Sequence, residues 1–152
     1  MKYKKTAVIL FITTICTIVF IWGNSFMPQA QSIAISGFVL KTLRATFNFG
    51  AADTPANATN LLREWAHVIE FFGLGFQLCA LALVSKKLSV LKCFIVVLAI
   101  SLVDEILQLF NDRSAQIVDI LKDFFGATAG ILTVYAIYKL IKLIKAKKFR
   151  TK

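Results

Sequence analysis

Long apolar segments dominate the pattern of the chain. Four of them approach the roughly 20 residues that a helix needs to cross a bilayer, and they cover about residues 6–26, 63–84, 90–110 and 117–141. We expect helices in all four, since every backbone polar group in lipid must be satisfied within its own segment. The pattern therefore predicts an all-α polytopic membrane protein, a four-transmembrane-helix bundle that forms one domain over residues 1–152.

The connections between these segments refine the prediction. The longest, residues 28–62, is mainly apolar over 33–47 with a repeat near helical spacing, which predicts an extracellular interfacial or re-entrant helix. Residues 50–60 hold Gly, Ala, Asp, Thr, Pro and Asn, which is typical of a loop. The connections at 85–89 and 111–116 are short, so we expect the spans that they join to be antiparallel neighbours.

The chain is 58% hydrophobic, more than a soluble domain of 152 residues can cover with polar surface. Its net charge of +10 is unevenly distributed. Of the 18 basic residues, 13 lie on one side of the predicted spans: Lys2, Lys4, Lys5, Lys86, Lys87, Lys92, Lys139, Lys142, Lys145, Lys147, Lys148, Arg150 and Lys152. The positive-inside rule makes that side cytoplasmic, so we expect both termini in the cytoplasm.

This charge distribution argues against nucleic acid as a partner and favours anionic lipid around the basic tail. The N-terminus has a second interpretation, as a signal peptide with a cleavage site near Ala30. Its apolar run is longer than the roughly 7–15 residues of a usual signal-peptide core. Removal of that segment would leave three spans.

Seven of the eight acidic residues lie in or beside the apolar segments, in two blocks with other polar residues. The first block is Arg63, Glu64, His67 and Glu70, and the second is Asp104, Glu105, Gln108, Asp112, Arg113, Asp119 and Asp123. A charged side chain in hydrocarbon costs about 2.5–3.5 kcal/mol even on the mildest scale. We therefore expect any chemistry or recognition to involve these residues.

The predicted topology brings both blocks to one depth, because the second span begins outside, the third ends there and the fourth begins there. Helical spacing also puts the polar residues of each span on one face. Gly126 and Gly130 lie on the face of Asp119 and Asp123, where small residues allow close helix approach. We expect an outward-facing polar pocket between these three spans.

The chemistry of these polar side chains suggests two sets of candidate site residues. Guanidinium groups suit phosphate or carboxylate, and histidine and crowded carboxylates suit acid–base catalysis or a divalent cation held through oxygen ligands. The ligand-binding candidates are Arg63, Gln108, Arg113, Asp119 and Asp123, and the catalytic candidates are His67, Glu70, Asp104 and Glu105. No complete metal motif is present and no cofactor is expected. The alternative is structural, with the arginines neutralising carboxylates and clamping the bundle.

These residues in this order resemble the VanZ-like family of small bacterial membrane proteins, named for a teicoplanin-resistance accessory protein. Residues 63–75 read Arg-Glu-Trp-Ala-His-Val-Ile-Glu-Phe-Phe-Gly-Leu-Gly, similar to the family's Arg-Lys-x-Ala-His-x-x-Glu-Tyr-x-x-Leu-Gly. The second block and Gly126 are similar to its Asp-Glu-x-x-Gln-x-Phe, Arg, Asp, Asp/Asn, Gly series. Glu64 replaces the usual Lys and Phe71 the usual Tyr, and the stretch before Arg113 is one residue shorter and lacks the usual Pro-Gly.

The resemblance implies a protein of the bacterial cytoplasmic membrane, in a family often linked to glycopeptide susceptibility. We expect it to engage outer-leaflet cell-wall or lipid head groups and to lower susceptibility to teicoplanin-like drugs. The expected partners are membrane lipids and a cell-wall precursor or a glycopeptide. One alternative is a membrane-embedded hydrolase or transferase acting on a lipid-linked substrate, although no Ser or Cys nucleophile motif supports it. The other is a small transporter, although the candidate charges lie in the outer half only.

Overall fold

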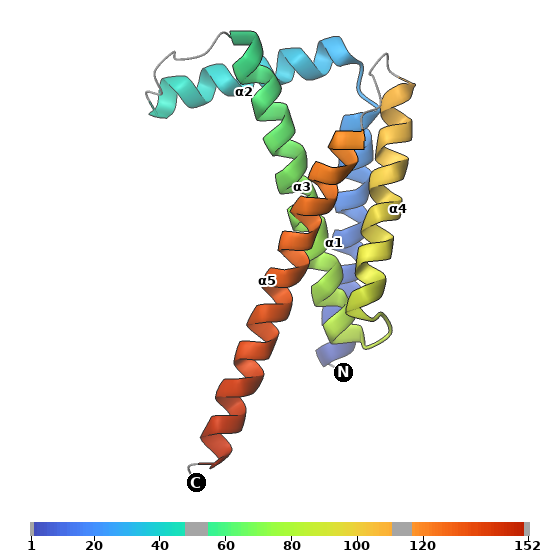
Figure 1. Cartoon of the computed structure of the whole chain (residues 1–152), viewed down its shortest axis with the longest axis vertical. Coiled ribbons are helices and arrows are strands. Elements are labelled where there is room, and N and C mark those ends of the chain that lie inside the picture. Colours follow the sequence, from blue (N-terminus) through green and yellow to red (C-terminus); the bar gives the residue numbers. More distant parts are fainter. Residues whose placement is uncertain (1, 48–54, 111–116, 151–152) are drawn as a thin grey trace.

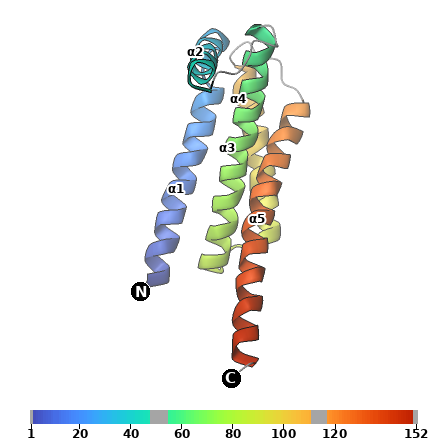
Figure 2. The ribbon, with the colours of Figure 1, turned by 90° about the vertical axis from the view of Figure 1, so that its left-hand side faces the viewer.

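The computed structural model describes residues 2–47, 55–110 and 117–150, and within them the chain is helical apart from short connections. The helices are α1 (Lys2–Ser25), α2 (Gln29–Phe47), α3 (Pro55–Ser85), α4 (Val90–Leu109) and α5 (Ile117–Arg150). Figures 1 and 2 show α1, α3, α4 and α5 running along one axis, with α2 lying across one end. Both termini lie at the other end. The all-α prediction is confirmed for the described residues.

Three of these helices, α1, α3 and α5, are long and apolar enough to cross a membrane. They overlap the predicted segments 6–26, 63–84 and 117–141. The 20 residues of α4 give it sufficient length, but Lys92 lies near one end and two carboxylates lie near the other. The crossing of the membrane by α4 therefore stays a prediction, although its residues match the predicted segment 90–110.

Two predicted boundaries are wrong. The helix expected over residues 33–47 begins at Gln29, and α3 begins at Pro55, so residues 55–60 are helical where the sequence predicts a loop. Proline suits the first helical position, because its fixed φ is that of a helix and its missing N–H would have no partner there. Residues 50–54 of the predicted loop lie outside the described residues.

The core lies between the four long helices. Phe71 and Leu74 of α3, Val97 of α4, Ile131 of α5 and Ile21 of α1 are fully buried. Large apolar side chains also cover the outward faces of the same helices. Soluble proteins rarely expose apolar patches of this extent, so the outer surface matches a lipid environment.

The most extensive helix contact in the described part of the chain is between α3 and α5. A Cβ atom on Gly126 would collide with the backbone of Val68, and one on Gly130 would collide with the carbonyl of Phe72. From the other side, a Cβ on Gly75 would collide with the carbonyl of Ala127. The predicted close approach at the glycines is confirmed, and it brings the two backbones into direct contact, as small residues do in membranes.

We expect Gly126→Ala and Gly130→Ala each to lower the free energy of unfolding by about 1–3 kcal/mol, because the added methyl forces two backbones apart. The measurement is unfolding of the purified protein in mixed micelles. Gly73→Ala is the matched control, since no atom lies within 4 Å of its Cβ position. It should leave stability unchanged or raise it by up to about 1 kcal/mol. Equal losses in all three variants would contradict the backbone contact.

Candidate functional site

The polar residues of both blocks lie toward the end of the bundle that α2 crosses, here called the polar end. The first half of α3, the last half of α4 and the first half of α5 all point to this end (Figure 1). The predicted convergence of the two blocks is therefore seen in the described residues. Asp112 and Arg113, which the sequence places in the same region, lie outside the described residues.

Asp104 is the central carboxylate of the polar end. Its side chain is 0% exposed, and Gln108 Nε2 donates a hydrogen bond to its Oδ2 at 3.0 Å. Its carboxyl group lies within electrostatic range of both Glu70 of α3 and Asp123 of α5. Neighbouring Glu105, 5% exposed, also acts electrostatically on Asp123. Carboxylates from three helices therefore lie within electrostatic range of one another.

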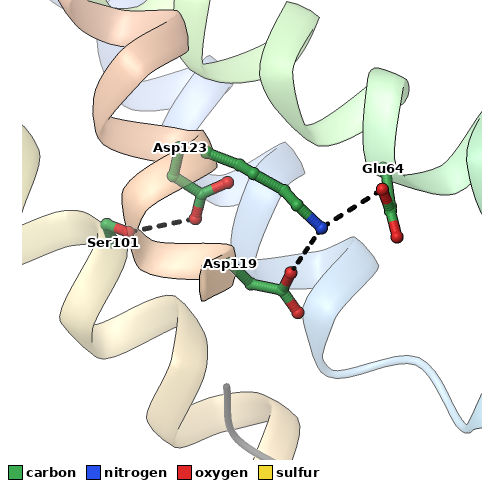
Figure 3. Close-up of polar contacts among 5 residues, drawn as sticks. Glu64, Ser101, Asp119 and Asp123 are labelled. Carbon is green, nitrogen blue, oxygen red and sulfur yellow. Dashed lines mark hydrogen bonds and ion pairs between the residues drawn. The ribbon is translucent and has the colours of Figure 1, made fainter. Parts of the chain in front are cut away.

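Asp123 joins α5 to α4. Ser101 Oγ donates a hydrogen bond to Asp123 Oδ2 at 3.0 Å (Figure 3), and both residues are buried. A buried carboxylate without a donor would carry a large desolvation cost. The hydroxyl of Ser101 offsets part of that cost at the α4–α5 contact.

Lys122 is a site residue that the sequence analysis missed. Its Nζ lies 3.1 Å from Asp119 Oδ1 and 3.2 Å from Glu64 Oε2 (Figure 3), so it links α5 to α3. The sequence could have indicated this residue, because a lysine that lies between two aspartates in an apolar helix needs a partner. The ion pair also accommodates Glu64 at a position where the resemblance expects Lys. Phe71, where the resemblance expects Tyr, is fully buried.

Arg63, His67 and Glu70 share one face of α3, as the helical spacing predicts. They line a pocket of about 360 Å³ whose other walls come from α1 and α2. Asn24 of α1 donates a hydrogen bond from Nδ2 to Glu70 Oε1 at 3.0 Å. The sequence analysis also missed Asn24, although it is a polar residue near the end of an apolar span.

The walls of this pocket differ from the expected ones. The sequence predicts a pocket between the second, third and fourth spans, whereas α1 and α2 face Arg63 and His67. The reason is the position of α2, which lies across the end of the bundle (Figure 1) and contributes Ser32, Ser36 and Val39 to the pocket. A further pocket toward α4 and α5 stays a prediction, because residues 111–116 are not described.

The chemistry available at the polar end follows from these contacts. Within residues 2–47, 55–110 and 117–150, no group of three or more His, Cys, Asp or Glu side chains is placed to hold a metal ion. Asp104, Asp123 and Glu70 each accept a hydrogen bond from a neutral side chain. Arg63 lines a pocket together with His67 and Glu70, and its guanidinium is the group of this set that is suited to binding an anion.

The fold and these contacts define an all-α membrane protein with buried polar residues between its helices at one end. The match to the VanZ/LLP1 family model covers residues 8–142, most of the chain. The chain therefore belongs to the VanZ/LLP1 family, and the resemblance drawn from the two polar blocks is confirmed. Comparisons with curated proteins and with solved structures give no match.

We expect Ser101→Ala to lower the free energy of unfolding by about 1–2 kcal/mol, because it removes the hydroxyl that satisfies a buried oxygen of Asp123. Unfolding in mixed micelles measures the change. Thr133→Ala is the control, since its hydroxyl donates to Ala129 O within its own helix and is exposed. If the two variants lose the same stability, the Ser101 hydrogen bond does not hold α4 to α5.

Proposed function

We propose that this VanZ/LLP1 protein binds a phosphate- or carboxylate-bearing head group in the pocket lined by Arg63, His67 and Glu70. One observation carries the proposal. Arg63 lines the pocket, and no carboxylate of the described residues forms an ion pair with it. Glu64 is already paired with Lys122. A guanidinium fork in a pocket is a good partner for a planar or tetrahedral anion.

The remaining walls fit an amphiphilic ligand. Phe20, Met27 and Val39 supply apolar surface, and Ser32 and Ser36 supply hydroxyl groups from α2. An anionic head group would lie near Arg63 while its chain follows the apolar wall toward the membrane. Lys41 and Arg44 of α2 add positive charge at this end, which raises the local concentration of anions.

The proposed location is the bacterial cytoplasmic membrane, with the polar end outside. Figure 1 shows the α3–α4 connection and the C-terminal end of α5 at the other end of the bundle. Among the described residues, Lys86 and Lys87 lie in that connection, Lys92 lies at the start of α4, and further lysines lie in the last turns of α5. The positive-inside rule favours that end as cytoplasmic. The head group would then come from an outer-leaflet lipid or a cell-wall precursor. Its capture offers a route to lower susceptibility to teicoplanin-like drugs that act on the same surface.

The second candidate is a membrane-embedded hydrolase or transferase acting on a lipid-linked substrate. It is favoured by one observation, that His67 and Glu70 line the same pocket as Arg63. An imidazole and a carboxylate beside a bound anion are the groups that general acid–base catalysis uses. Turnover of the bound lipid that His67→Ala abolishes while binding persists would select this candidate over binding alone.

We expect phosphatidylglycerol or a polyprenyl phosphate to raise the thermal stability of the purified protein, and Arg63→Gln to remove that increase. Binding to the native state adds about 2.7 kcal/mol at a hundredfold excess over Kd. Arg63→Lys should retain part of it, because the charge remains and the fork is lost. Lys87→Gln, at the other end of the bundle and outside the basic tail, is the control. An unchanged increase in Arg63→Gln would exclude Arg63 as the anion ligand.

The proposed orientation has its own test, in a variant without Cys16, Cys79 and Cys93. A single cysteine at position 41, replacing Lys41 of α2, should react with a membrane-impermeant maleimide in intact cells. A single cysteine in place of Lys145 should react only after permeabilisation. The reverse labelling pattern would place the polar end in the cytoplasm and would rule out an outer-leaflet ligand.

A further inference from the structure

A second pocket, of about 440 Å³, lies between α3 and α5 and is separate from the Arg63 pocket. Most of its lining is apolar: Leu61, Trp65, Val68, Val118, Leu121 and Phe125. Trp65, Leu121 and Phe125 are 57%, 61% and 70% exposed. Because these side chains are largely exposed, the groove is open at the outer surface of α3 and α5, which lipid would surround in a membrane.

The polar residues of this groove are Glu64 and Lys122. Lys122 Nζ binds one oxygen of Glu64 and one oxygen of Asp119. These three residues form the polar edge of the groove, here called the rim, which holds two carboxylates and one ammonium. All three side chains are partly exposed, at 50%, 31% and 35% for Glu64, Lys122 and Asp119. The rim therefore carries one net negative charge at the edge of an apolar groove.

This combination selects among lipid classes. The apolar walls suit an acyl chain. The second oxygens of Glu64 and Asp119 can accept hydrogen bonds from a primary ammonium, while the third N–H of Lys122 can donate to a phosphate. An anionic phospholipid without an amine would bring its charge against two carboxylates. A quaternary ammonium has no N–H group to donate.

We propose that the α3–α5 groove is a lateral binding site for a phospholipid with a primary ammonium head group, of the phosphatidylethanolamine type. The head group lies over Glu64, Lys122 and Asp119, and an acyl chain lies along Leu121 and Phe125. The site does not depend on the function proposed for the Arg63 pocket, because none of its lining residues is shared with that pocket.

The test is native mass spectrometry of the purified full chain with equimolar phosphatidylethanolamine, phosphatidylglycerol and phosphatidylcholine of matched acyl chains. We expect phosphatidylethanolamine to be retained about two- to fivefold over each of the others, since partly exposed ion pairs contribute little each. The double variant Glu64→Gln, Asp119→Asn should bring this ratio to about one or below. Both residues are partly exposed, so the exchange should leave the fold intact.

A second pair of variants tests the groove itself. Leu121→Trp fills the groove and should abolish retention of the selected lipid. Leu132→Trp is the matched control, because it lies on the same face of α5 about three turns further on, is 54% exposed and does not line the groove. It should retain the lipid as the unaltered chain does.

Three results would overturn the proposal. The first is an unaltered chain that retains the three lipids equally or favours phosphatidylglycerol. The second is a double variant that keeps the full preference for phosphatidylethanolamine. The third is Leu121→Trp retaining this lipid as well as Leu132→Trp does.

Discussion

The backbone contact between α3 and α5 is the constraint on which the polar end depends. Gly126 lies against the backbone of Val68, and one helical turn earlier on each helix stand Lys122 and Glu64. Both helices run in the same direction past this contact. The close approach of the two backbones therefore also brings the ammonium of Lys122 to the carboxylate of Glu64. A side chain at Gly126 would push the two backbones apart and so lengthen the distance between that ammonium and that carboxylate.

Hydrogen bonds between helices complete the arrangement around this contact. Asn24 ties α1 to Glu70 of α3, and Ser101 ties α4 to Asp123 of α5. Farther from the polar end, Thr17 Oγ1 of α1 donates to Gln77 Oε1 of α3 at 3.0 Å. In lipid an unsatisfied buried polar group costs several kcal/mol, so each of these neutral donors makes it possible to keep a carboxylate or an amide inside the bundle. The buried acids thus act as clamps as well as candidate ligands.

Much of the fold could be predicted from the sequence, because the lengths of the apolar runs and the spacing of Gly126 and Gly130 are local features. The candidate residues of α3, α4 and α5 were also predictable, since charges in apolar helices are costly and therefore conspicuous. Lys122 and Asn24 were missed, because the contact that each side chain makes depends on which helix lies opposite. The start of α3 at Pro55 was missed because its first residues have the composition of a loop. The part played by α2 in the Arg63 pocket depends on where that helix lies in three dimensions, which its own residues do not specify.

The two pockets take consecutive charged residues of α3 to different sides of the helix. Arg63 and Glu64 are consecutive, so their side chains leave the helix about 100° apart, one into the pocket under α2 and the other onto the groove beside α5. A single helix therefore presents a cation without a described ion-pair partner on one side and a carboxylate-rich rim on the other. Under the two proposals, an anionic head group would be drawn to the Arg63 side of α3 and an ammonium-bearing one to the Glu64 side, since electrostatic complementarity discriminates partners through the repulsion of the wrong ones. Glu64 contributes to this asymmetry, because it supplies one of the two carboxylates that lie beside Lys122.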